Sequence, residues 1–169
     1  MNLTDLNELY RHMEWADATV WRVVLASDAA RVDVKLRELF HHLHLVQRAF
    51  LRVWRSELRD VPYPKFEDPR LLMEWGRSYY PEAFAHLESL SDDELAKPLN
   101  LPWASMVEEQ LGRAPGDTTL RDTALQVALH SLYHRGQINA RLREIGGEPP
   151  LVDYIAWFWL DRPQADWKF

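Results

Sequence analysis

The sequence predicts an all-α protein: a four-helix bundle with one long crossover connection and an extra helix at the C-terminal end. Apolar residues recur at helical spacing over four long segments, and polar turns with cap residues separate these segments. One stretch rich in proline and glycine, residues 91–118, breaks the pattern and predicts the crossover. A chain of 169 residues, 47% of them hydrophobic, can bury one core, so we expect a single domain over residues 1–169.

The first two long helices follow from their caps and their apolar spacing. Thr4 is typical of an N-cap, and the residues after it predict a helix over residues 5–27. Asp33 is placed to cap a second helix over residues 34–59, and the three prolines that follow indicate a loop.

The third helix and the crossover come next. Asp68 lies directly before a proline, which is typical of a helix start, and the third helix is predicted over residues 69–90. The crossover lacks a sustained helical stripe. Within it we expect a short β-hairpin around residues 99–103 and 106–110.

The fourth helix has clear signals at both ends. Thr119 and Asp122 resemble a capping box, and a helix over residues 120–145 ends at two glycines that begin with Gly146. A last helix over residues 151–160 is apolar nearly all round, so both of its sides must be covered. The bundle can cover one side, and a second subunit of a homodimer is expected on the other.

Charge and composition exclude several classes of protein. The net charge is −6 and the basic residues are scattered, which argues against binding nucleic acid through a basic field. The lack of cysteine excludes disulfides, thiolate metal sites and a cysteine nucleophile. No uninterrupted window of about 18 apolar residues predicts a transmembrane helix, and the polar, acidic N-terminal segment is unlike a signal peptide. We therefore expect a cytoplasmic protein with no nucleic-acid or membrane partner.

Two histidines, His130 and His134, carry the most specific chemical pattern in the sequence. Four residues apart on the predicted helix, they lie about 40° apart on one face and within roughly 6 Å at Cβ. One metal ion can bind both, although two histidines at this spacing also occur as ordinary surface residues. His134 lies about 50° and His130 about 90° from the centre of the apolar stripe, at the edge of the inner face. Metal sites in helical bundles are built there, from side chains of facing helices.

A third ligand must come from another helix, and the second helix offers the run HHLH. On the same arithmetic, His42 lies about 80° from the centre of that helix's stripe, His44 about 120° and His41 about 180°. Only His42 is near the inner edge, whereas His41 should be solvated. Three imidazoles without a thiolate leave a fourth position open to water, as in catalytic metal sites. Zinc, nickel, iron and manganese all accept imidazole, so the pattern predicts one divalent ion, with zinc favoured.

Three stretches of the chain resemble motifs of one family. The stretch HSLYHRGQINARLREIGGEPPLVDY resembles the C-terminal motif of the DinB-like (YfiT-type) family of metalloproteins. The stretch LFHHLHLVQRAFL resembles the motif of its second helix, and YRHMEWADATVW resembles its opening helix. The resemblance spans residues 3–153, and the run HRGQ with the histidine before it is the most specific part.

The resemblance implies a four-helix bundle that holds a divalent metal with His42, His130 and His134. His42 is chosen because Phe50 and Leu51 lie eight and nine residues after it, where the motif has an aromatic residue and a leucine. Relatives are often homodimers, and some are S-transferases or related isomerases that use low-molecular-weight thiols such as bacillithiol, mycothiol or glutathione. The chain departs from the motif at Gln47, where an acidic residue is common, and at Phe50, where tryptophan is common.

Residues near the histidines have more ordinary interpretations. Arg135 is either an anion anchor beside the metal or, as we favour, half of a salt bridge to the first or second helix. Gly136 is interpreted as a point where another helix approaches closely. Gln137 is either a hydrogen-bond partner of a ligand histidine or polar surface, and His12 and His86 are given no role. The acidic residues considered as partners of Arg135 are Glu14, Asp17 and Glu38. The two on the first helix, Glu14 and Asp17, could also serve as a general base or a fourth metal ligand, but we expect them to be solvated.

These observations favour an enzyme. A bound metal would activate water or a low-molecular-weight thiol, which predicts a thiol S-transferase or a hydrolase that acts on a small-molecule substrate. No catalytic residue is assigned besides the metal ligands. Two alternatives stay open: a non-catalytic metal site that staples the second helix to the fourth, and a helical interaction module that binds a partner through residues 154–160.

Overall fold

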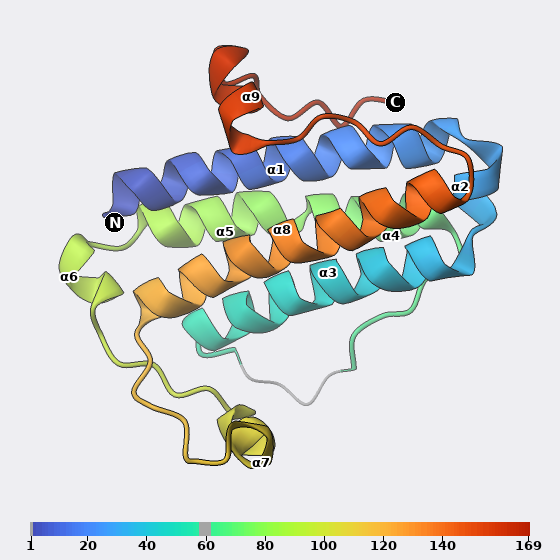
Figure 1. Ribbon diagram of the computed structural model, residues 1–169. Coiled ribbons are helices and arrows are strands. Elements are labelled where there is room, and N and C mark those ends of the chain that lie inside the picture. The colour runs from blue at the N-terminus through green and yellow to red at the C-terminus, as the bar shows by residue number, and fades with distance from the viewer. Residues whose placement is uncertain (1, 58–61) are drawn as a thin grey trace.

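The computed structural model describes residues 2–57 and 62–169, which form a bundle of helices (Figure 1). The all-α prediction is confirmed, since these residues contain helices and no named strand. The bundle helices are α1 (Leu3–Ala26), α3 (Val34–Trp54), α4 (Pro69–Arg77), α5 (Tyr79–Glu88) and α8 (Leu120–Glu144). α8 packs along both α3 and α1, while α4 and α5 follow one another as the fourth member of the bundle.

Short helices connect or extend the bundle. The predicted β-hairpin is wrong, because residues 99–103 form no strand and residues 104–111 form 3₁₀ and α-helical turns that end at Gly112, a glycine in the left-handed conformation. One isolated bridge, between Pro98 and Thr119, is the only β-pairing in the described part of the chain.

The last helix is shorter than the predicted 151–160. The short helices are α2 (Asp28–Val32), α6 (Asp92–Leu95), η1 (Ala104–Val107), α7 (Glu108–Leu111) and α9 (Tyr154–Trp159).

The direction of the helices shows where the chain crosses the bundle. α1 and α8 run one way, and α3 and the α4–α5 pair run the other way (Figure 1). The chain therefore returns along the bundle between α3 and α4. Residues 91–118, which were expected to cross over, instead join α5 to α8 at one end of the bundle (Figure 1).

Side-chain caps fix the starts of the long helices. Asn2 caps α1 instead of Thr4: the Asn2 side chain accepts a hydrogen bond of 2.9 Å from the backbone of Asp5, whose carboxylate bonds back to the Asn2 backbone at 3.0 Å. Asp33 caps α3 as predicted, and Thr119 begins α8 with the predicted capping box.

Two predicted helix boundaries change. α3 ends at Trp54, whereas the predicted end, residue 59, lies outside the described residues. The third predicted helix breaks at Ser78 into α4 and α5. Pro81 explains the break, because it has no N–H group to bond the carbonyl of Arg77.

Large aromatic side chains fill the core along the bundle. Trp21 of α1 stacks on Phe40 of α3 with ring centroids 3.8 Å apart, and both are at most 1% exposed. Tyr79 and Leu142 bring α5 and α8 into the same core, and Trp157 of α9 joins it from outside the four helices. No described helix is both long and apolar enough to cross a membrane.

Candidate metal centre

Three histidines from two neighbouring helices converge. His42 lies on α3, and His130 and His134 lie one turn apart on α8. One nitrogen of each ring lies within 4.8 Å of the other two, and the Nε2 atoms of His130 and His134 are 3.1 Å apart. The centroid of the His42 ring is 5.2 Å from that of His130 and 4.6 Å from that of His134. The structure thus brings together the three residues that the sequence indicated, and their role as ligands stays a prediction.

The chemistry of the three rings fits a divalent ion. A tetrahedral ion with Zn–N bonds of about 2.0–2.1 Å places its ligand nitrogens roughly 3.3 Å apart, so small ring rotations would close the site. The Nδ1 atoms of His130 and His134 are buried without a hydrogen-bond partner, while their Nε2 atoms face each other. The facing Nε2 atoms are the nitrogens of His130 and His134 that one cation could bind together. No other group of three or more metal-binding side chains occurs in the described part of the chain.

Lowered pKa values keep the three rings neutral, although His42 is the exposed member of the group. The pKa of His130 falls to about 4; burial is the largest cause, and the neighbouring His134 and His42 contribute to the same shift. Burial also lowers the pKa values of His42 and His134, although the Gln137 side chain opposes this at His134. Because neutral imidazole is the form that binds metal, the three rings are ready to bind an ion at neutral pH.

The other two histidines of the HHLH run are bonded elsewhere. His44 is fully buried: its Nδ1 donates to Oε1 of Gln47 at 2.9 Å, and its Nε2 accepts from Nε1 of Trp21 at 3.0 Å. Both of its nitrogens are therefore engaged. Nε2 of His41 donates to the carbonyl of Pro64 at 2.8 Å and the residue is half-buried, so the expectation that His41 is solvated is wrong.

α4 explains the burial of both His44 and His41, because it covers a second face of α3. Gly76 approaches His44 so closely that a Cβ atom there would lie 2.3 Å from its Nε2. Trp75 stacks on His41 with ring centroids 5.7 Å apart.

The close approach predicted at Gly136 is wrong, since a Cβ atom on that glycine would meet nothing within 4 Å. The helix contact that needs a glycine is at Gly76.

Arg135 forms the salt bridge that we favoured, and Asp17 is its partner. Its Nη1 donates to Oδ1 of Asp17 at 2.7 Å, and the two side chains are 2% and 1% exposed. Such burial excludes Arg135 as an anion anchor for a substrate. The expectation that Asp17 is solvated is wrong, because Arg135 and the hydroxyl of Tyr80 both bond its carboxylate. Glu14 is also partly buried, which raises its pKa, and it accepts a hydrogen bond from Trp167.

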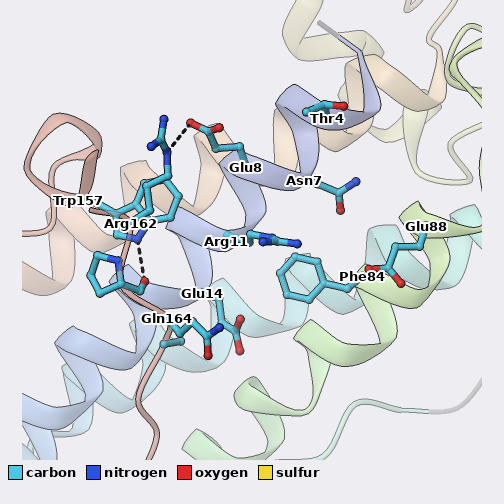
Figure 2. Close-up of a pocket in the computed structure, with 12 residues that line it drawn as sticks. Thr4, Asn7, Glu8, Arg11, Glu14, Phe84, Glu88, Trp157, Arg162 and Gln164 are labelled. Carbon is cyan, nitrogen blue, oxygen red and sulfur yellow. Dashed lines mark hydrogen bonds and ion pairs between the residues drawn. The ribbon is translucent and has the colours of Figure 1, made fainter. Parts of the chain in front are cut away.

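A separate hollow of about 790 Å³ lies between α1, α5 and the C-terminal segment (Figure 2). None of the three histidines lines it. Arg11 and Phe84 extend into it, and Arg162 bonds Glu8 at its edge (Figure 2). Its charges are of both signs and no metal-binding group of side chains meets there, so the histidine cluster has the more specific chemistry.

The fold and the cluster together define a class: helical bundles with histidines on facing helices, as metal-binding bundles have. The sequence model of the DinB family matches residues 1–165, and the chain therefore belongs to the DinB family. The match includes all three histidines and confirms the resemblance noted in the sequence. Comparison with curated proteins gave no match.

Proposed function

We propose that this protein is a metalloenzyme in which His42, His130 and His134 hold one divalent ion, with zinc favoured. The observation that carries the proposal is the convergence of three imidazoles whose nitrogens lie within 4.8 Å of one another. No fourth histidine, cysteine or carboxylate joins this group among the described residues. One coordination position is therefore free, as in catalytic zinc sites.

The proposed reaction is thiol S-transfer or hydrolysis of a small molecule. A divalent ion, when bound, supplies a Lewis acid that lowers the pKa of a water or a thiol at the free position. The ring of Tyr133 packs edge-on against His134 with centroids 5.1 Å apart, and Tyr133 is 64% exposed. Leu129, on the turn before it, is 53% exposed. These two side chains offer an apolar rim on which a substrate can lie.

The experiment compares zinc-loaded protein, metal-free protein and His130→Ala in two assays. Glutathione with a chromogenic aryl halide reports S-transfer, and a nitrophenyl ester reports hydrolysis. We expect turnover of one substrate by the loaded wild type, and loss of that turnover in the other two samples. Full turnover by metal-free protein would contradict the proposal.

The alternative is a non-catalytic staple, supported by the same geometry, since the histidines lie on both α3 and α8. A ligand that binds only the folded state stabilises it by mass action, so the metal should raise the melting temperature in either case. A staple predicts this rise without turnover in either assay. Equal melting temperatures with and without metal would rule the staple out.

We also propose a homodimer that forms through an apolar surface around α9. This surface is exposed to between 41% and 74%, and α9 lies on the outside of the bundle against α1 (Figure 1). Large exposed apolar patches are unusual on monomers and mark interaction sites. A different protein partner is the alternative. The residues of this α9 surface are Leu151, Tyr154, Ile155, Phe158, Trp159 and Leu160.

A further inference from the structure

A network of buried polar side chains lies inside the bundle and joins its helices. Gln47 of α3 is at its centre: its Oε1 accepts from His44, and its Nε2 donates to Oδ2 of Asp17 at 3.1 Å and to Oγ of Ser131 at 3.2 Å. Asp17 of α1 in turn accepts from Arg135 of α8 at 2.7 Å. All five side chains belong to residues that are at most 2% exposed. The network therefore links α1, α3 and α8 by bonds that solvent does not weaken.

The two residues that α8 contributes to this network directly follow its two histidines. Ser131 follows His130, and Arg135 follows His134. Consecutive residues of a helix lie about 100° apart, so each pair directs one side chain into the core and one toward the histidine cluster. The inward members are buried and hydrogen-bonded to Gln47 and Asp17 inside the bundle, whereas the histidines are only partly buried.

We infer that Ser131, Arg135 and Gln47 are positioning residues, which set the rotation and height of α8 so that its histidines face α3. The inference rests on the proposed metal site. A slip of one residue moves a helical side chain by about 1.5 Å along the axis and turns it by about 100°. A metal site tolerates a misplacement of only about 0.5 Å.

Apolar packing alone does not fix a helix so closely. Burial of apolar surface is non-directional, and it favours many nearby arrangements of α8 about equally. Hydrogen bonds lose strength steeply when their angle is poor, and charge-assisted bonds are the strongest of them. The bonds of Ser131 and Arg135 therefore select one arrangement, in which His130 and His134 meet His42.

Thr123 provides a matched control on the same two helices. Its hydroxyl accepts a hydrogen bond of 2.8 Å from Nε1 of Trp54 on α3, and Thr123 is 1% exposed. It too ties α8 to α3 from inside the bundle, but it lies two turns before His130. Ser131→Ala and Thr123→Val each remove one buried hydroxyl from this helix pair, and only the first of them lies beside a histidine.

The test measures zinc dissociation constants by competition with a chromophoric chelator, and melting temperatures of metal-free protein by circular dichroism. We expect Ser131→Ala to bind zinc about tenfold more weakly and Gln47→Met between about tenfold and 100-fold more weakly. Thr123→Val should melt at a lower temperature but bind zinc as the wild type does. Cobalt(II) provides a second readout, since its visible absorption should change in Ser131→Ala and Gln47→Met and not in Thr123→Val.

The outcomes separate this inference from the proposed function. Wild-type zinc affinity in both Ser131→Ala and Gln47→Met overturns the inference and leaves the metal site standing. An equal loss of affinity in Thr123→Val also overturns it, because affinity would then follow stability alone. A wild-type protein that binds no zinc overturns the proposed function and the inference with it. If Gln47→Met does not fold, Ser131→Ala decides, since it removes a single hydroxyl.

Discussion

Arg135 and Asp17 form an ion pair inside the bundle, with Nη1 and Oδ1 2.7 Å apart and with side chains 2% and 1% exposed. The second carboxylate oxygen of Asp17 accepts from Gln47 and from Tyr80. Arg135 thus compensates the charge of Asp17, and Gln47 and Tyr80 provide hydrogen bonds to its second oxygen. Removing one partner of a buried ion pair leaves an uncompensated charge in the core, which is strongly destabilising.

We therefore expect Arg135→Met to lower the free energy of unfolding by about 3–5 kcal/mol. Urea denaturation of the metal-free protein measures this. Arg141→Met is the control on the same helix, because Arg141 pairs with Asp33 at 2.7 Å while 32% of its side chain is exposed. Its loss should be much smaller than that of Arg135→Met, because solvent screens a partly exposed ion pair. Equal losses in the two variants would show that burial does not govern the Arg135 pair.

Two glycines should respond in opposite ways to substitution by alanine. Gly76→Ala forces a Cβ atom to within 2.3 Å of the buried His44 ring, so we expect a loss of about 1–3 kcal/mol. Gly136→Ala meets nothing within 4 Å in the middle of α8, so helix propensity should stabilise it by up to about 1 kcal/mol. Thermal melts of the metal-free variants test both signs. A destabilised Gly136→Ala would reveal a contact that the structure lacks.

Metal-free protein should lose stability as the pH falls from about 6.5 to about 4. His130 titrates at about 6.5 in an unfolded chain, whereas burial lowers its pKa to about 4 in the folded protein. Between these values the unfolded chain binds a proton that the folded chain does not. The free energy of unfolding therefore decreases as the pH decreases. The stability that neutral His130 contributes is complete above about pH 6.5 and is lost near pH 4.

Melting temperatures between pH 7.5 and pH 4.5, taken at intervals of about one pH unit, measure this loss. His130→Gln removes the titrating ring and should show a smaller decrease than the wild type. Burial lowers the pKa values of His44 and His12 in the same direction, so some decrease remains in the variant. Identical curves for the two proteins would contradict the pKa shift at His130.

The α9 surface predicts a dimer that one charge can break. Light scattering after size exclusion should give the wild type twice the 20.0 kDa mass of the chain. Trp159 is 74% exposed, and Trp159→Glu should give the monomer mass, because a buried carboxylate is costly in an apolar interface. Met106→Glu is the control, since Met106 is 77% exposed and lies on η1. A wild type that is monomeric at all concentrations would exclude the dimer.

The arrangement of the histidines was largely predictable from the sequence. The spacing of His130 and His134 on a helix places them on one face, and the apolar stripe of each helix directs them and His42 to neighbouring edges. Those inferences need only local geometry. The DinB match then supports the fold over residues 1–165.

Contacts between helices were harder to predict, because a stripe on one helix does not show what covers its other faces. His44 is a polar residue outside the stripe of α3, yet α4 buries it through Gly76. Asp17 was one of three acidic residues that Arg135 could reach, and the sequence does not choose among them. Pro81 was a usable signal for the break at Ser78, since a proline removes the bond to the carbonyl four residues before it.

Metal content of purified protein tests whether His42, His130 and His134 hold an ion. The measurement compares the wild type with His42→Ala and His41→Ala, two adjacent substitutions on α3 of which only the first removes a ring from the cluster. We expect one zinc per chain in the wild type and in His41→Ala, and none in His42→Ala. A wild type that takes up no divalent metal, or a His42→Ala variant that keeps its full content, would contradict this expectation.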